Sequence, residues 1–281
     1  MDAIDAKAGE LQETFAANRA SGQIALTVAA AAGLSRRSRV HEAGSLRVRF
    51  PNGSDPAQTN AVIVNTAGGM AGGDSFDIAV AVGAGAKLTV TTAAAEKVYR
   101  SLGPQAKAGI KLAVGPGGNL AWLPQETIMF DCARLHRTID VELSDDGELL
   151  LAEAVVFGRT AMGEAVARGS LFDRWRVRVG GTLVFAETAR LDEPIAQRLT
   201  EAAAAAHGAA VASVLKIPAD EGSVEAVRCA RRNFTGEVGV SAWNGLALAR
   251  LVATDGASLR RDLTTVLTTW SRAPLPRLWL N

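Results

Sequence analysis

The chain has 281 residues, of which 48% are apolar, and its net charge is +1. This length can bury a sizeable core in one large domain or two modest ones. The balance of 30 basic against 29 acidic residues argues against a nucleic-acid partner, which would require a basic face. Two cysteines are too few for a disulfide framework, and the apolar run over residues 24–33 is too short to span a bilayer. We therefore expect a cytoplasmic protein without a membrane partner.

The sequence predicts mainly strands up to about residue 190. Residues 1–20 carry four acidic side chains before any apolar run, and we expect them to form a disordered extension. From Phe76 to Val82 apolar residues alternate with small or polar ones, which is typical of a half-buried strand. Glycine is frequent at 28 residues and aromatic residues make up only 5%, so tight turns and an aliphatic core are predicted. Residues 21–190 are expected to form a β-rich core.

A weak repeat runs through this core. The segments VGAGAKL, VGPGGNL, LSDDGEL and VGGTL each place a turn between two strands, and the leucines after the turns stand at 88, 120, 149 and 183. Steps of 32, 29 and 34 residues favour stacked strand–turn–strand units, as in a β-helix. A β-sandwich with regularly spaced hairpins remains an alternative at this point.

Residues 191–281 mix helices and strands, and we expect a smaller α+β part packed on the core. An apolar stripe predicts a helix from Ile195 to Ala206, and Ser223 is a possible N-cap of a short helix. Strands are predicted over residues 211–217, 238–240 and 246–252. The clearest helix ends the chain, because five apolar residues recur on one face: Leu259, Leu263, Val266, Leu267 and Trp270.

The densest glycine cluster is NTAGGMAGGD, at residues 65–74. A phosphate-binding P-loop would need Lys and Ser or Thr after its last glycine, but Gly73 precedes Asp74 and Ser75. A dinucleotide-binding loop would open a helix, whereas a strand pattern follows here. The glycines therefore indicate a sharp turn or a close backbone approach.

Three further segments contain candidate site residues. In DCARLH, Cys132 and His136 offer a thiolate and an imidazole to a transition metal, but no second ligand pair lies near them in sequence, and a buried, inert cysteine is the alternative. In AEKVYRS, the residues Lys97, Tyr99 and Arg100 are of types common at protein interfaces, although surface display explains them equally. LPQETIMF joins a proline bend to an acid, an amide and an apolar strand.

These motifs, in this order and spacing, resemble those of the urease accessory protein UreD family, also called UreH. NTAGGMAGGD, TTAAAEKVYRS, LPQETIMFD and the terminal PLPRLW carry the resemblance, which spans residues 21–279. It implies a β-rich helical stack of strands with a few C-terminal helices. The residues that match the family motifs are Gly68, Gly69, Gly72, Gly73, Asp74, Lys97, Val98, Tyr99, Arg100, Pro124, Gln125, Glu126 and Thr127.

The resemblance also implies a function. Such proteins are non-enzymatic maturation factors that bind the urease apoprotein and join UreF and the GTPase UreG to insert nickel. The resemblance implies no firmly bound cofactor and an internal passage through which nickel passes transiently. Asp74 and Glu126 are our candidates for lining it, because hydrated divalent cations favour carboxylates. The alternative is a small-molecule enzyme that binds an anionic ligand at the glycine-rich loop.

Overall fold

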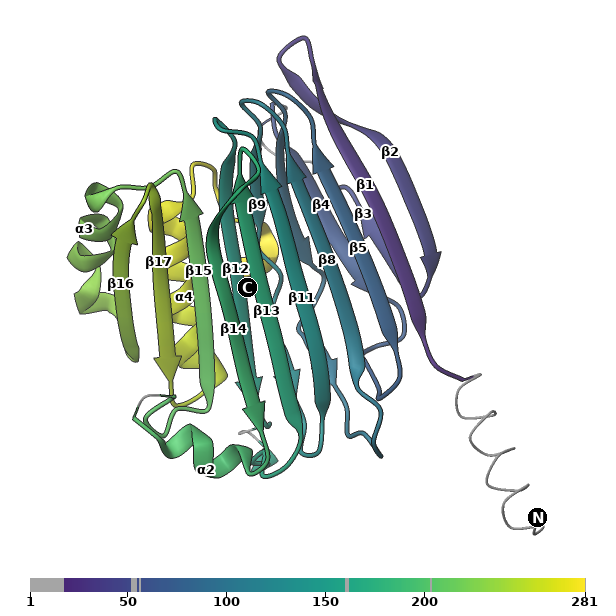
Figure 1. Cartoon of the computed structure of the whole chain (residues 1–281), viewed down its shortest axis with the longest axis vertical. Helices are drawn as coiled ribbons and strands as arrows, with labels where there is room; N and C mark the ends of the chain where they lie inside the picture. The colour runs from purple at the N-terminus through teal and green to yellow at the C-terminus, as the bar shows by residue number, and fades with distance from the viewer. Residues whose placement is uncertain (1–17, 52–54, 56, 160–161, 203, 281) are drawn as a thin grey trace.

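A computed structural model describes residues 18–51, 55, 57–159, 162–202 and 204–280. Within these residues the strands form two large facing sheets, and the chain passes back and forth between them (Figure 1). The result is a β-solenoid of about four turns with few helices. The mainly β fold with a stacked, β-helix-like core is thereby confirmed. The predicted N-terminal disorder concerns residues 1–17, which lie outside the described residues.

The inner strands of both sheets are parallel, as expected for a solenoid. Across sheet A the order is β14 (Thr182–Asp192), β13 (Ser170–Val179), β11 (Arg134–Leu143), β8 (Ala106–Val114), β5 (Ser75–Val82), β1 (Ser21–Ala31) and β2 (Leu34–Gly44). Across sheet B it is β16 (Glu237–Trp243), β17 (Leu246–Ala253), β15 (Ala210–Ile217), β12 (Glu148–Phe157), β9 (Asn119–Trp122), β6 (Lys87–Thr92), β4 (Thr59–Asn65) and β3 (Leu46–Arg49). Two short strands pair with each other, and the second also pairs with β12: β7 (Glu96–Val98) and β10 (Thr127–Met129).

The first three units of the predicted repeat stack on one another. Val82 pairs with Val114 across β5 and β8, and Val114 pairs with Leu143 across β8 and β11. The leucines that follow these turns pair in the same way in sheet B. All of these side chains are buried between the sheets, so each unit covers the apolar face of the next.

The fourth unit is a hairpin, and its predicted place in the stack is wrong. After β13 the chain reverses at Gly180 and Gly181, which have φ of 55° and 80°, and returns as the antiparallel edge strand β14. Two residues with positive φ are what a tight hairpin turn requires. Leu183 is therefore 47% exposed instead of continuing the buried column.

The C-terminal part extends sheet B through β15, β17 and β16. The helices are α2 (Ile195–Thr200), α3 (Glu221–Cys229) and α4 (Gly256–Trp270), with single 3₁₀ turns η2 (Arg231–Asn233) and η3 (Arg277–Trp279). Helix α4 buries the predicted apolar face against β15 and β17, and the predicted strands of this part are confirmed. Because β15 pairs with β12, sheet B continues across residue 190. The division into 1–20, 21–190 and 191–281 stays a prediction.

Two helix predictions need correction. The N-cap of α3 is Asp220, whose carboxylate accepts a hydrogen bond from the Ser223 amide at 3.0 Å, so Ser223 is not the cap. Helix α2 ends at Thr200, because the next residue, Glu201, adopts an extended conformation with ψ of 131°. The alanine-rich run therefore does not continue the helix to Ala206, and Ala206 and His207 have positive φ in the turn that leads to β15. Of the helices in the described ranges, none has the length and apolar character needed to cross a bilayer.

Candidate functional site

The glycine-rich loop at residues 65–74 joins β4 to β5, and two of its glycines touch neighbouring segments closely. A Cβ on Gly69 would lie 2.4 Å from the Tyr99 ring, and one on Gly72 would lie 2.2 Å from the Ser101 hydroxyl oxygen. No side chain tolerates such distances, so both positions require glycine. The prediction of a close backbone approach is confirmed.

Hydrogen bonds within the chain fasten the same loop. The buried Asp74 carboxylate accepts from the Ala20 amide at 2.8 Å and from the Ala71 amide at 2.7 Å. Five other amides of the loop donate to backbone carbonyl oxygens: those of Thr66, Gly68, Met70, Gly73 and Asp74. Because these donors already have protein acceptors, they do not form the cradle of N–H groups that binds a phosphate.

The three sequence motifs lie side by side at one corner of the solenoid. Met70 of the glycine-rich loop forms a β-bridge with Val98, and the Tyr99 hydroxyl donates to the Gly68 carbonyl oxygen at 2.8 Å. Strand β7 then pairs in parallel with β10, which places Glu96 opposite Thr127. We call residues 65–74, 96–101 and 124–131 the motif corner. The structure thus brings together segments that are separate in the sequence.

The motif corner also has an exposed side. Lys97 and Arg100 are exposed to solvent, whereas Tyr99 is half-buried, with its ring edge against Phe130 at a centroid distance of 5.2 Å. Pro124 is half-buried at the start of the third segment. The two cations are therefore available for contacts with other molecules.

Helix α4 and the C-terminal segment contact the buried side of the third motif. Arg260 donates to Gln125 at 2.6 Å and forms an ion pair with Glu126 at 2.9 Å. The Arg260 guanidinium lies 5.0 Å from the Trp279 ring centroid, and the Trp279 indole donates to the Leu123 carbonyl oxygen at 3.0 Å. The LPQET and PLPRLW motifs therefore stabilise each other, and Glu126 already has a cationic partner.

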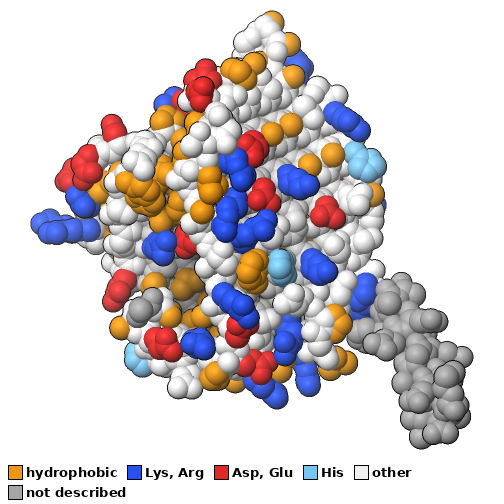
Figure 2. All heavy atoms as spheres, in the orientation of Figure 1, with side chains coloured by type: hydrophobic (Ala, Val, Ile, Leu, Met, Phe, Trp, Pro, Cys, Tyr) orange, Lys and Arg blue, Asp and Glu red, His pale blue; other side chains and the backbone are white. Residues whose placement is uncertain are grey.

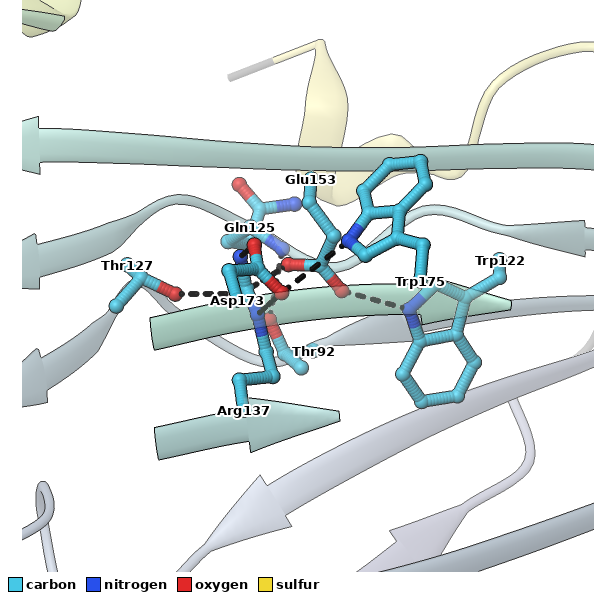
Figure 3. A network of polar contacts seen from close by, with 8 residues as sticks. All are labelled: Thr92, Trp122, Gln125, Thr127, Arg137, Glu153, Asp173 and Trp175. Carbon is cyan, nitrogen blue, oxygen red and sulfur yellow. Dashed lines mark hydrogen bonds and ion pairs between the residues drawn. The ribbon is translucent and has the colours of Figure 1, made fainter. Parts of the chain in front are cut away.

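A polar network lies in the solenoid interior, between the two sheets (Figure 3). Arg137 of β11 donates to both carboxylate oxygens of Asp173 on β13 and to Glu153 on β12. Two indole N–H groups complete the network. Trp122 donates to Glu153 at 2.9 Å, and Trp175 donates to Asp173 at 3.2 Å. Buried charges persist in a core only when they are paired and hydrogen-bonded, as they are here.

The network holds one more carboxylate than it has cations. Burial raises the pKa of Glu153 to about 7, against the lowering effect of Arg137. Burial opposes the charge of Arg137, but the carboxylates of Asp173 and Glu153 hold its pKa above the ordinary value. A proton on Glu153 removes the excess negative charge from the interior, and this balance explains why the Glu153 pKa rises.

A cavity of about 70 Å³ adjoins this network. Glu153, Asp173 and Glu187 contribute to its lining, and burial raises the pKa of Glu187 as well. Glu187 pairs with Arg250 at 3.1 Å. The cavity can hold water and presents several carboxylates to whatever enters it.

The motif corner contains a further carboxylate, Glu96, which is half-buried. Glu96 accepts a hydrogen bond from the Asn65 amide group at 3.0 Å. Burial raises the pKa of Glu96 to about 7, and the negative charge of Asp74 raises it further. The corner therefore contains a carboxyl group that titrates near neutral pH.

Comparison with known proteins decides the family. The family model described as UreD urease accessory protein matches residues 20–280. The chain belongs to the UreD family. It is 56% identical over 269 residues to a urease accessory protein UreD of Rhodopseudomonas palustris, covering 96% of each chain. It is also 54% identical over 267 residues to one of Bradyrhizobium diazoefficiens, covering 95% of this chain and 96% of the relative.

Membership confirms the resemblance inferred from the motifs. UreD proteins are non-catalytic accessory factors that assist nickel insertion during urease maturation. The alternative of an enzyme that binds an anionic ligand at the glycine-rich loop is therefore wrong. The structure agrees, because loop amides that donate to carbonyl oxygens of this chain are not free to bind an anion.

The proposed metal ligands Cys132 and His136 do not form one cluster with further ligands. Cys132 lies in the turn before β11 with φ of 64°, and its thiol contacts Asp131 at 3.4 Å. His136 lies on β11, and its ring stacks on Phe172 at 4.4 Å. Over the described ranges, no group of three or more His, Cys, Asp and Glu side chains is arranged to hold a metal ion.

Sequence reasoning missed the interior network, although a signal for it was present. Arg137 stands between Leu135 and Ile139, at the position of β11 that faces the core, and Glu153 interrupts the apolar run of β12. A charged residue at a core-facing position of a strand needs a buried partner. The alternation therefore marks these charges, but it does not show which residues pair.

Proposed function

We propose that this protein is the scaffold of a cytoplasmic complex that loads nickel into urease. In this proposal it binds the urease apoprotein, joins UreF and the GTPase UreG, and takes part in nickel insertion driven by GTP hydrolysis. The observation that carries the proposal is the match to the UreD family over residues 20–280. The contribution of this chain is to favour one conformation of the apoprotein through differential affinity.

The glycine-rich loop supports the assignment of GTP hydrolysis to a partner. Gly73 is followed by Asp74 and not by the Lys and Ser or Thr of a P-loop. The Asp74 carboxylate turns toward backbone amides of its own chain, where it would repel a phosphate. The nucleotide chemistry therefore belongs to another subunit of the complex.

Nickel would contact this chain only transiently, at carboxylates. Asp74 and Glu126 stay our candidates, and each has a partner in the structure: backbone amides for Asp74 and Arg260 for Glu126. The cavity beside Glu153 and Glu187 adds a further group of carboxylates. Oxygen ligands that are already hydrogen-bonded suit a brief contact better than a closed metal site.

A complementation experiment tests the proposal. Urease activity and bound nickel are measured in cells that lack this protein and in cells that express it with UreF, UreG and urease. Activity and nickel should both depend on this chain, while the amount of urease protein should not. Full nickel occupancy without the chain would contradict the proposal.

The carboxylate candidates are tested with neutral variants of similar shape. Asp74→Asn and Glu126→Gln should leave assembly with UreF intact but lower the nickel content of urease, because a neutral group attracts a divalent cation less. Asp77→Asn is the matched control, since Asp77 is exposed on β5, the strand that begins directly after Asp74. Wild-type nickel occupancy in both variants would exclude these two residues from the nickel route.

A further inference from the structure

Sheet B extends beyond sheet A, and this leaves one face of its last strands uncovered. Sheet A ends at β14, whereas β15, β17 and β16 continue sheet B, and α4 lies on the opposite face of these strands (Figure 1). Figure 2 shows hydrophobic side chains gathered on the uncovered side. Trp243 of β16 is 39% exposed there, with its ring centroid 6.4 Å from that of Phe185.

The edge of β16 lacks the row of charged side chains seen at the edge of sheet A. Strand β2, at that edge, carries Arg36, Arg37 and Arg39, and charged side chains of this kind keep other strands from pairing. The sequence of β16 is EVGVSAW, in which Glu237 is the one charged residue. In the described part of the chain, β16 pairs with β17 alone. Its outer side is therefore suited to accept a further strand.

A groove runs beside this edge, between α3, η2 and β16. Its cavity of about 700 Å³ has an apolar floor that includes Val227, Phe234, Val238 and Val240. Three arginines also line it: Arg228, Arg231 and Arg232. Among the described residues, Arg231 and Arg232 have no acidic side chain within ion-pair distance, whereas Arg228 pairs with Glu221.

The charge of the groove is positive on balance. Arg228 lies 3.4 Å from Glu221, but both side chains are more than half exposed, so this pair is weak. Glu225 is the acid that lines the groove, and it does not offset three arginines. An apolar floor with an unneutralised basic rim complements a segment that is apolar and acidic.

We propose that this groove binds an extended acidic segment of a partner protein, which adds a strand to sheet B at β16. Alternate side chains of such a segment point to opposite faces of the sheet. On one face, apolar residues would cover Val238 and Val240, with carboxylates reaching Arg231 and Arg232. On the other face, the segment would cover Trp243. Strand addition of this kind takes affinity from backbone hydrogen bonds and specificity from alternate side chains.

The proposal rests on the proposed function for the source of the segment, which is a protein of the urease maturation complex. The chemistry of the groove, in contrast, stands on the residues named above. Two measurements separate these two parts.

The first measurement uses a defined probe with the full-length protein. A fluorescent peptide with threonine at every second position, for the Trp243 face, and with valine and glutamate in turn at the positions between, for the groove face, should bind saturably. The same peptide with lysine in place of glutamate should not bind. The double variant Arg231→Glu/Arg232→Glu should bind the acidic peptide at least about tenfold more weakly, because attraction becomes repulsion. Arg36→Glu/Arg39→Glu, with the same charge change on β2, is the matched control and should bind like wild type.

Three results of this measurement would overturn the proposal. These are the absence of saturable binding, equal binding by the Arg231/Arg232 double variant, and self-association of the wild type that this variant abolishes. The last result would make a second copy of the chain the occupant of the groove. Thermal unfolding of both double variants verifies that they are folded, as expected for changes at exposed side chains.

The second measurement titrates wild type and the same variants with purified UreF and with urease apoprotein. The Arg231/Arg232 variant should lose about tenfold in affinity for one of them, and this loss should shrink at high salt because exposed charges are screened. Unchanged affinity for both overturns the assignment to the complex, while the proposed function stands. If wild type binds neither protein, the proposed function fails, and the peptide measurement still tests whether the groove binds an acidic segment.

Discussion

The glycine-rich loop and the interior network both keep carboxylates away from water, but they do so by different means. In the loop, neutral backbone amides satisfy Asp74, and glycines let the chain pass close to Tyr99. In the network, a guanidinium ion satisfies Asp173 and Glu153 across two sheets. The loop therefore depends on shape and the network on charge, so different changes should disrupt them.

Removing the cation should have the largest effect on stability. Arg137→Leu leaves two buried carboxylates without their partner, which should cost about 3–5 kcal/mol of the free energy of unfolding at neutral pH. Urea denaturation measures this loss. Arg178→Leu is the matched control, because Arg178 forms an ion pair with Glu142 at 3.4 Å on the exposed face of sheet A. Arg178→Leu should cost at most about 1 kcal/mol. Equal losses of unfolding free energy in the two variants would show that the buried network stabilises the fold no more than an exposed ion pair does.

A single added carbon should disrupt the loop. Gly69→Ala places a Cβ against the Tyr99 ring and 2.8 Å from the Lys97 carbonyl oxygen, and should cost about 1–3 kcal/mol in thermal unfolding experiments. Gly68→Ala is the control, since Gly68 has φ of 76° but open space around its Cα. It should cost only the strain of positive φ, about 1 kcal/mol. A larger loss for Gly68→Ala would contradict the steric explanation.

A change of pH should affect the network with a predictable sign. The pKa of Glu153 is about 7 in the folded protein and 4.5 ordinarily, so the folded state binds this proton more tightly. The stability from Glu153 is therefore complete below about pH 4.5 and is lost as the pH rises toward 7, by about 1–3 kcal/mol.

The variant Glu153→Gln isolates this contribution. Free energies of unfolding at about pH 5 and pH 7 should differ less in the variant than in wild type, because the amide does not titrate. Glu96, whose pKa is also about 7, should account for part of the remaining difference. A pH dependence identical to that of wild type would show that Glu153 does not titrate in this range.

Much of the fold could be predicted from local sequence patterns, and the wrong prediction for the fourth repeat unit has a local cause too. The turns after Val82, Val114 and Leu143 stack as predicted because each begins and ends with a residue that must be buried. The turn at Gly180 also contains glycine, but it is shorter than the other three and reverses the chain within sheet A. Its Gly-Gly pair is typical of a two-residue hairpin, so the length of the turn, and not its glycine content, distinguishes the two outcomes.

The candidate site was partly predictable in the same sense. The motifs pointed to residues 65–74, 96–101 and 124–131, and the structure places them side by side. Their partners were not predictable: Arg260 is separated from Glu126 by 134 positions in the chain. No local pattern encodes a contact over such a distance.

The sequence by itself determined the period of the strands, the place of the glycine-rich loop, the apolar face of α4 and the family. These depend on neighbouring residues and on the order of the motifs. Only the tertiary structure decided that Arg137, Asp173 and Glu153 share one interior site, and that β16 is the last strand of sheet B among the described residues, beside a groove lined by arginines. Such features arise where strands from different turns of the solenoid meet, and that meeting depends on the packing of the whole chain.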